Sequence, residues 1–397
     1  MVTDGPSASP PGSVQARPPT TAFDASRPHS DLQTDDFAFD LPADLIAQTP
    51  LEPRDATRLL VVDKGSGSVT HHSFRDIPAL LEAGDVLVVN DSRVLAGRIH
   101  AVRATGGRVE FLLLRPRASS SPVVSDGSTS GCEWSVWWEA LVRPANRIRP
   151  GMQLVVAGAE LSDEGPVTVE VGERTASGGV LIRFDSSVDR VLHRFGEMPL
   201  PPYIRTRLAD ATRYQTVYAQ ETGSAAAPTA GLHFTVALLD AVRDRGVRVV
   251  PVTLHVGADT FRPVRADRIT DHEMHAEYAI VPDATASAIT DARRNGHRVV
   301  AVGTTAVRTL ETWVRALGGT RANLPEAGWQ GWTRIFLYPG VDFQVVDALV
   351  TNFHVPRSTL LMLVSAFAGS GVVREAYATA IAARYRFYSF GDTCFFR

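Results

Sequence analysis

Short apolar runs with the alternation of β-strands fill the middle of the chain. Glycine, proline or aspartate separates six such runs, which occupy residues 97–104, 108–115, 134–143, 153–158, 167–173 and 180–185. Several short strands at this spacing are typical of a small antiparallel barrel or sandwich. We therefore predict an inserted β-barrel domain over residues 76–190.

After about residue 190 the pattern changes to helices that alternate with strands. Apolar positions 236, 238, 239 and 242 predict a helix over 234–246, which Thr235 caps and Gly246 ends. The alternation continues with helices over 284–296 and 306–317, strands over 247–257 and 297–303, and the apolar segments 334–340, 346–353 and 358–367. Such alternation indicates an α/β layer with substantial parallel pairing.

Two further strands are predicted before the barrel, at 58–63 and 85–91, and both need partners. The economical fold is a mixed α/β domain, made of residues 37–75 and 191–397, with the small antiparallel β-barrel inserted into it. Residues 1–36 are rich in Pro, Ser, Thr and Asp, so we expect a disordered N-terminal tail. We interpret the Ser/Gly-rich stretch 119–131 as a mobile hairpin tip.

Composition narrows the class of protein without naming a function. The 397 residues are 44% hydrophobic and 21% charged, which is typical of a globular protein with two domains. No apolar run approaches the roughly 18 residues that span a bilayer, and the N-terminus lacks the pattern of a secretory signal. Cys132 and Cys394 are too few for a disulfide framework or a zinc finger. We therefore expect a cytoplasmic protein without membrane contact.

Charge argues against indiscriminate binding to nucleic acid but is compatible with a local basic surface. The net charge is −3 at neutral pH. Arg143, Arg147 and Arg149 follow Trp137 and Trp138, and arginine with aromatic residues suits phosphate contact and base stacking. A solvated barrel edge with core tryptophans is the commoner explanation for such residues.

Three loops that follow predicted strands carry polar side chains. In the first, a stretch of small residues from Gly223 to Gly231 includes Thr229 and leads to His233, which suits close approach of a ligand. The second holds Thr304 and Thr305. The third, at 351–362, holds Asn352 and His354. Ligands of α/β sheets favour the carboxyl ends of strands, whereas a packed loop with a buried histidine and ordinary helix caps are the structural alternatives.

Other polar residues are weaker candidates. His255 stands at a strand end, and Asp91 with Arg93 forms either a ligand-binding pair or a surface ion pair. His272 and His275 lie among acidic residues but lack the H-E-x-x-H spacing, so we expect no metal. Phosphate-loop, dinucleotide-binding and G-x-S-x-G motifs are missing from the sequence, which argues against dependence on ATP or NAD and against an α/β-hydrolase.

Taken together, the motifs resemble one family, the S-adenosylmethionine:tRNA ribosyltransferase-isomerases of queuosine biosynthesis. The matching stretches run in the family's order from about Phe37 to Asp392 and include GDVLVVNDSRVLAGRI, GSAAAPTAGLHFT, VTLHVGADTFRPV, HEMHAEY, AVGTTAVRTLE and TNFHVPRSTLLMLVSAFAG. The resemblance implies an α/β domain that carries an inserted barrel. It also implies transfer and isomerisation of the ribosyl unit of S-adenosylmethionine (AdoMet).

The implied acceptor is the 7-aminomethyl-7-deazaguanine base at the wobble position of tRNA. The implied products are epoxyqueuosine in the tRNA, adenine and methionine. On this reading AdoMet is a co-substrate, no metal takes part, the partner is tRNA, and we expect a monomer. The C-terminal GDTCFFR departs from the family's usual ending.

The resemblance marks the residues that would carry the reaction. His233 and His255 are the candidates for base and acid because imidazole titrates near neutral pH. The candidates for holding AdoMet and substrate are Asp91, Arg93, Arg213, Tyr214, Thr229, Gly231, Thr304, Thr305, Arg308, Tyr338, Asn352 and His354. Among them, Arg213, Arg308 and His354 suit contact with carboxylate or phosphate.

Two alternatives stay open at this point. An enzyme of this family could transfer the ribosyl unit to a free deazapurine or another small amine. A protein of another class could keep the fold as an inactive RNA-binding or scaffold protein. Salt-sensitive binding of a tRNA anticodon stem–loop separates the first alternative from the tRNA enzyme, and failure to bind AdoMet would support the second.

Overall fold

The computed structural model describes residues 31–117, 136–159, 165–175, 178–257 and 264–397. Residues 1–30 of the predicted tail and the whole stretch 119–131 lie outside the described residues. Residues 31–36 do not extend as a tail, because Leu32 and Phe37 are buried in the main core around the short 3-10 turn η2 (Thr34–Phe37).

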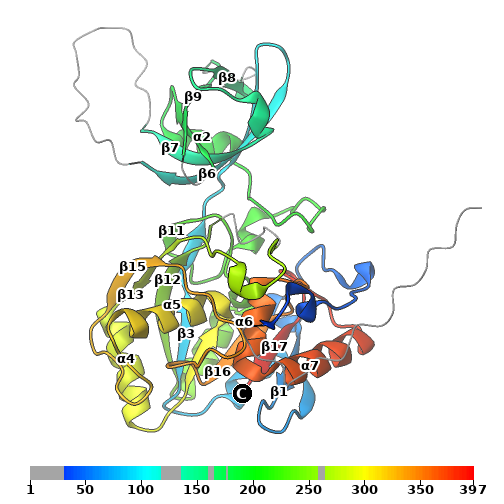
Figure 1. The fold of residues 1–397 in the computed structure, drawn as a ribbon, viewed down its shortest axis with the longest axis vertical. Coiled ribbons are helices and arrows are strands. Elements are labelled where there is room, and N and C mark those ends of the chain that lie inside the picture. Colours follow the sequence, from blue (N-terminus) through cyan, green and yellow to red (C-terminus); the bar gives the residue numbers. More distant parts are fainter. Residues whose placement is uncertain (1–30, 118–135, 160–164, 176–177, 258–263) are drawn as a thin grey trace, which may run out of the picture.

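A nine-stranded mixed sheet forms the frame of the larger part of the molecule (Figure 1). Its strands, in spatial order, are β15 (Trp329–Thr333), β13 (Glu277–Val281), β12 (Arg248–His255), β3 (Val86–Asn90), β14 (Val299–Val302), β16 (Ala348–Asn352), β17 (Thr393–Phe396), β1 (Arg58–Val62) and β2 (Val69–Ser73). The central strands β12, β3, β14 and β16 run parallel. Their carboxyl ends therefore meet at one edge of the sheet.

Helices cover both faces of the sheet, which is why the central strands read as continuous apolar runs. The bounds are α1 (Ile77–Leu80), α3 (Val236–Asp244), α4 (Asp283–Arg294), α5 (Gly303–Ala316), α6 (Thr359–Ala368) and α7 (Ser370–Ala382). Helices α4 to α7 build the larger core on one face, and α1 with α3 builds the core on the other. The predicted mixed α/β class is thereby confirmed.

The predicted barrel is also present and stands at one end of the molecule (Figure 1). Its closed strand order is β10 (Val180–Phe184), β7 (Trp138–Arg143), β6 (Arg108–Pro116), β5 (Arg98–Val102), β8 (Gln153–Val156) and β9 (Thr168–Arg174). Alternate residues of every strand except β7 are buried in a separate core that α2 (Val188–Phe195) helps to close. All six predicted strands therefore lie in this barrel.

The predicted domain boundary at residue 76 differs from the structure. Strand β3 lies at the centre of the large sheet, because its five residues are buried between β12 and β14. Strand β4 (Ser92–Val94) pairs with β11 (Glu221–Ser224), which also belongs to the larger part of the molecule. The barrel strands begin at Arg98, so the first connection to the barrel follows β4.

Two other elements differ from their predicted ranges. Helix α5 begins at Gly303 instead of residue 306, so Thr304 and Thr305 lie in its first turn. The apolar stretch 334–340 contains no strand, because the edge strand β15 precedes it.

Among the described residues, no single helix is long and apolar enough to cross a membrane. Helices α6 and α7 would qualify only as a pair, and the chain bends by 113° between them.

Candidate active site

An open cleft of about 1900 Å³ lies between the barrel and the carboxyl edge of the large sheet. The barrel contributes residues such as Arg115 and Trp138 from β6 and β7. The sheet side contributes the ends of β12, β14 and β16 with the loops that follow them. Ligand sites of α/β folds favour this edge, because loops from neighbouring parallel strands converge there.

The three polar loops noted in the sequence lie side by side in this cleft. Thr229 donates a hydrogen bond from Oγ1 to Oδ1 of Asn352 over 2.9 Å, although 123 residues separate them. A Cβ atom built on Gly303, at the start of α5, would lie 3.6 Å from Cβ of Ala230. The loop before α5 therefore packs directly against the loop that carries Thr229.

His233 lies behind the cleft and is not part of its lining. Its side chain is buried, and both ring nitrogens have partners: Nδ1 lies 3.0 Å from Thr57 Oγ1 and Nε2 lies 3.2 Å from Asn352 Nδ2. Burial, with added repulsion from Arg386 and Arg54, lowers the pKa of His233 to about 3. The imidazole is consequently neutral at physiological pH.

The direction of these hydrogen bonds is fixed by one backbone carbonyl. Asn352 Nδ2 lies 3.2 Å from the carbonyl oxygen of Tyr388, which can only accept, so this side-chain atom must be the amide nitrogen. The same NH₂ group then donates to Nε2 of His233, which leaves the ring proton on Nδ1, facing Thr57. Asn352 Oδ1 is left to accept from Thr229.

His255 lines the cleft at the end of β12. Its Nδ1 atom is buried and has no hydrogen-bond partner among the described residues. Burial lowers the pKa of His255, while the nearby Glu221 opposes that shift. Nδ1 faces Gly223, and the ring as a whole lines the cleft, where a neutral imidazole has the properties of a general base.

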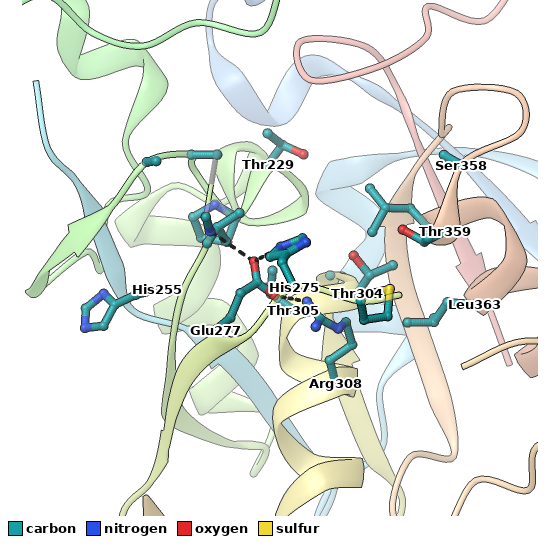
Figure 2. A pocket seen from close by; sticks show the side chains of 18 of the residues that line it. Thr229, His255, His275, Glu277, Thr304, Thr305, Arg308, Ser358, Thr359 and Leu363 are labelled. Atoms are coloured by element: carbon teal, nitrogen blue, oxygen red, sulfur yellow. Dashed lines mark hydrogen bonds and ion pairs between the residues drawn. The ribbon is translucent and has the colours of Figure 1, made fainter. Parts of the chain in front are cut away.

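A buried ion pair crosses the floor of the cleft (Figure 2). Nη1 of Arg308 contacts Oε2 of Glu277, and both side chains are almost fully buried. Oε1 of Glu277 accepts from the backbone N–H of Gly257 over 3.0 Å, and His275 Nε2 lies 3.2 Å from it. Burial alone would raise the pKa of Glu277, but the Arg308 guanidinium and the His275 contact lower it to about 2.

Other predicted ligands in the lining are Thr304, Thr305, His354 and Tyr214. His354 Nε2 lies 2.8 Å from Thr351 Oγ1, and burial lowers the pKa of His354 to about 3. Tyr214 packs edge-on against Phe390, with ring centroids 5.9 Å apart.

Three predicted ligands lie outside the lining and have structural partners. The carboxylate of Asp91 accepts from Thr253 Oγ1 over 2.7 Å, and burial raises the pKa of Asp91. Arg93 donates to the carbonyl oxygen of Ala219 over 2.8 Å. Arg213 forms an ion pair with Glu52 over 2.7 Å.

Gly231 and Tyr338 also lie outside the lining. A side chain at Gly231 would collide with the hydroxyl of Tyr218, so this glycine makes room for the buried hydroxyl of a partly buried tyrosine. Tyr338 packs against Phe336, with ring centroids 5.0 Å apart. Neither residue reaches the cleft directly.

Arg143, Arg147 and Arg149 are exposed on the barrel and do not line the cleft. Other basic side chains do line it, among them Arg115, Arg117 and Arg334. Arg115 lies 5.0 Å from the ring centroid of Trp332, which is 53% exposed, and so joins the barrel to β15. Sequence reasoning missed this contact, because no local pattern connects residues so far apart in the chain.

The described residues contain no group of three or more His, Cys, Asp and Glu side chains that could hold a metal ion. Sequence reasoning placed Glu277 and His275 in a superficially metal-like cluster. In the structure their neighbour is the Arg308 guanidinium, so the acidic charge is neutralised by an arginine.

The fold and the cleft define an α/β enzyme whose site lies at the carboxyl edge of the sheet, beneath an inserted β-barrel. The chain belongs to the queuosine biosynthesis protein family, whose model matches residues 34–396.

Similar proteins include the S-adenosylmethionine:tRNA ribosyltransferase-isomerases of Moorella thermoacetica and Caldanaerobacter subterraneus. They are 48% and 46% identical, respectively, and each match covers 91% of this chain and 98% of the relative. A solved structure, the S-adenosylmethionine tRNA ribosyltransferase of Thermotoga maritima, is 35% identical. Its match covers 91% of this chain and all of the solved chain, with a TM-score of 0.49.

Proposed function

We propose that the chain transfers and isomerises the ribosyl unit of AdoMet onto 7-aminomethyl-7-deazaguanine at the wobble position of tRNA. The products are epoxyqueuosine in the tRNA, adenine and methionine. The observation that carries this proposal is the 48% identity to a ribosyltransferase-isomerase over 98% of that relative's length. The proposal includes action as a monomer in the cytoplasm without a metal.

His255 is the proposed general base. The AdoMet sulfonium acidifies the neighbouring C5′ hydrogens of the ribose, so a neutral imidazole can remove one of these protons. Burial keeps the pKa of His255 below its ordinary value, which favours the neutral form at physiological pH. His255 can then donate this proton to the adenine that leaves when the ribose ring opens. The same residue therefore acts first as the general base and then as the general acid.

His233 has a positioning role in this proposal, which replaces the acid–base role considered from the sequence. Its Nε2 atom accepts a hydrogen bond from the Asn352 amide, whose orientation the Tyr388 carbonyl fixes, and so helps to hold that amide in place. Oδ1 of Asn352 in turn accepts a hydrogen bond from the Thr229 hydroxyl. Oγ1 of Thr229 and Oδ1 of Asn352 therefore present lone pairs to the cleft. Such acceptors suit the ribose hydroxyls of the donor and the amine of the acceptor base.

The cleft is large enough for a nucleoside donor together with a flipped base. At about 1900 Å³ it exceeds the usual range of roughly 300–1,000 Å³ for a single small ligand. Exposed Trp332 and the arginines at its mouth suit base stacking and phosphate contact.

The test uses purified protein, AdoMet and tRNA that carries 7-aminomethyl-7-deazaguanine. Adenine release is followed together with the mass of the tRNA nucleosides, and we expect epoxyqueuosine to form in step with adenine. If the protein binds AdoMet but forms neither adenine nor epoxyqueuosine with this tRNA, the proposed acceptor is wrong. Turnover with the free deazapurine base would then identify a small-molecule enzyme.

A further inference from the structure

Arg308 has hydrogen-bonding capacity that the protein does not use. The residue is only 6% exposed and lines the cleft. Nη1 is engaged by Glu277, whereas Nε and Nη2 have no hydrogen-bond partner among the described residues. Leaving donors of a buried charged group unpaired is costly, and such a vacancy in a cleft points to a ligand.

The two unpaired nitrogens form a matched pair. The N–H bonds of Nε and Nη2 lie on one edge of the planar guanidinium and run parallel, which fits the two oxygens of a carboxylate. Glu277 holds the opposite side of the group, and the Gly257 and His275 contacts hold Glu277. The guanidinium is therefore oriented before any ligand arrives.

A third donor lies on the same helix face. Thr305 precedes Arg308 by three residues on α5, so the two side chains are neighbours on its surface (Figure 2). Oγ1 of Thr305 is buried and, like the Arg308 edge, has no partner among the described residues. Because Thr305 lines the cleft, its unpartnered hydroxyl is a second hydrogen-bonding group beside the Arg308 edge.

The first turn of α5 adds a favourable field. The helix has 14 residues, and its N-cap, Val302, has no side chain able to cap the free N–H groups. These groups and the positive end of the helix dipole attract an anion. Glu277 already compensates the charge of Arg308, so the helix terminus contributes to binding a further negative group.

We infer that Arg308, Thr305 and the first turn of α5 bind the carboxylate of the methionine end of AdoMet. This inference rests on the proposed function, because it assigns one part of that donor to one part of the cleft. Arg308 is buried, whereas contact with the phosphates of a folded RNA requires exposed arginines. Arg334 is an exposed arginine at this cleft. The small donor is therefore the better source of the anion than the tRNA backbone.

The test compares two ligands, AdoMet and its decarboxylated analogue, by calorimetric titration of the full-length protein. R308Q is expected to lower the affinity for AdoMet about 10- to 100-fold, which is the usual effect of losing hydrogen bonds to a charged group. Affinity of R308Q for decarboxylated AdoMet should stay within about twofold of the unmodified protein. The carboxylate is the only group that differs, so the ratio isolates its contact with Arg308.

Two further variants protect this test against misfolding. T305V keeps the Arg308–Glu277 pair and removes one hydrogen-bond donor. Its affinity for AdoMet should therefore fall about 3- to 10-fold, while its affinity for decarboxylated AdoMet should not change. R315Q is the matched control, because Arg315 lies on the same helix, pairs with the buried Glu311, and does not line the cleft. R315Q should leave both affinities unchanged.

Each other outcome has a separate meaning. If R308Q and T305V lose affinity for AdoMet and for decarboxylated AdoMet to the same extent, the carboxylate assignment is overturned while the proposed function stands. Unchanged AdoMet affinity in R308Q with a raised KM for tRNA would reassign the arginine to an RNA phosphate and also overturn it. Failure of the unmodified protein to bind either ligand would contradict the proposed function itself.

Discussion

At the scale of single residues, two histidines with similar sequence signals have different environments. His233 ends a conspicuous small-residue loop, yet its ring is enclosed and both nitrogens are engaged. His255 ends an ordinary strand, yet it lines the cleft with a nitrogen unpaired among the described residues. Burial lowers the pKa of both, but only His255 reaches the space where a substrate would bind.

His255 gives the first prediction. The base must be unprotonated, so kcat/KM should fall as pH decreases, and the lowered pKa should place this fall below pH 6.5. H255A should lose about 10²- to 10⁴-fold in kcat, the usual contribution of a general base. Single-turnover adenine release across pH measures both effects. Near-normal turnover in H255A would remove this residue from the chemistry.

The second prediction concerns stability and pH at His233. The unfolded histidine takes up a proton near pH 6.5 whereas the folded one does so only near pH 3, so the free energy of unfolding should decrease as pH falls between these values. Between pH 7 and pH 4.5 this linkage amounts to roughly 2.5 kcal/mol. H233Q should therefore show a shallower decrease, measured by denaturant unfolding.

A control separates this effect from general acid sensitivity. His193 is exposed on α2, so H193Q should keep the pH dependence of the unmodified protein. The same slope in H233Q and the unmodified protein would contradict a buried, neutral His233.

At the scale of elements, the positions of the site residues depend on where β11 and β12 end and where α5 begins. Gly223 in β11 adopts φ 145°, and a Cβ there would lie 3.1 Å from Nδ1 of His255. The short β4–β11 pair thus sets the position of His255. In the same way, the start of α5 at Gly303 turns Thr304 and Thr305 from loop residues into the first turn of a helix.

The third prediction tests β11. G223A should cost about 1–3 kcal/mol of stability through backbone strain, and it should also lower kcat because the new methyl group displaces His255. G67A is the matched control, since Gly67 has φ 72° but nothing within 4 Å of its would-be Cβ. G67A should lose comparable stability with unchanged kcat. Equal kcat in both variants would show that β11 does not position the histidine.

At the scale of the whole molecule, the barrel stands beyond the large sheet (Figure 1), and residues of β6 and β7 line one side of the cleft. Arg115 of the barrel and Trp332 of β15 meet across its mouth. Exposed arginines beside them produce a local basic surface on a chain whose net charge is −3. Overall charge is therefore a poor guide to RNA binding here.

The fourth prediction concerns this surface. R334Q should raise KM for tRNA, leave AdoMet affinity unchanged, and reduce the slope of log affinity against log salt by about 1, because one phosphate contact is lost. R245Q is the control, since Arg245 is exposed at the end of α3, at the opposite edge of the sheet. A triple R143Q/R147Q/R149Q variant, measured alongside, tests the predicted contact on the outer barrel. If R334Q binds tRNA as well as the unmodified protein does, Arg334 does not contact tRNA at the entrance of the cleft.

By itself, the sequence determined the fold class, many of the strands and helices, and the family. Apolar alternation placed all six barrel strands, and helical periodicity placed α3, α4 and α5, because both patterns report local burial. The contiguous motifs identified the family because chance cannot reproduce such blocks. The boundary near residue 76 was misplaced, since a fully apolar strand such as β3 does not reveal which sheet it joins.

Tertiary structure alone decided which polar side chains work together. The Arg308–Glu277 pair, the Thr57–His233–Asn352–Thr229 chain and the Arg115–Trp332 contact each join residues far apart in the sequence. Their protonation and hydrogen-bonding capacity follow from burial and from partners brought close by folding, and neither has a signature in local sequence. That is why His233 attracts attention in the sequence, whereas the unpaired edge of Arg308 is visible only in the folded molecule.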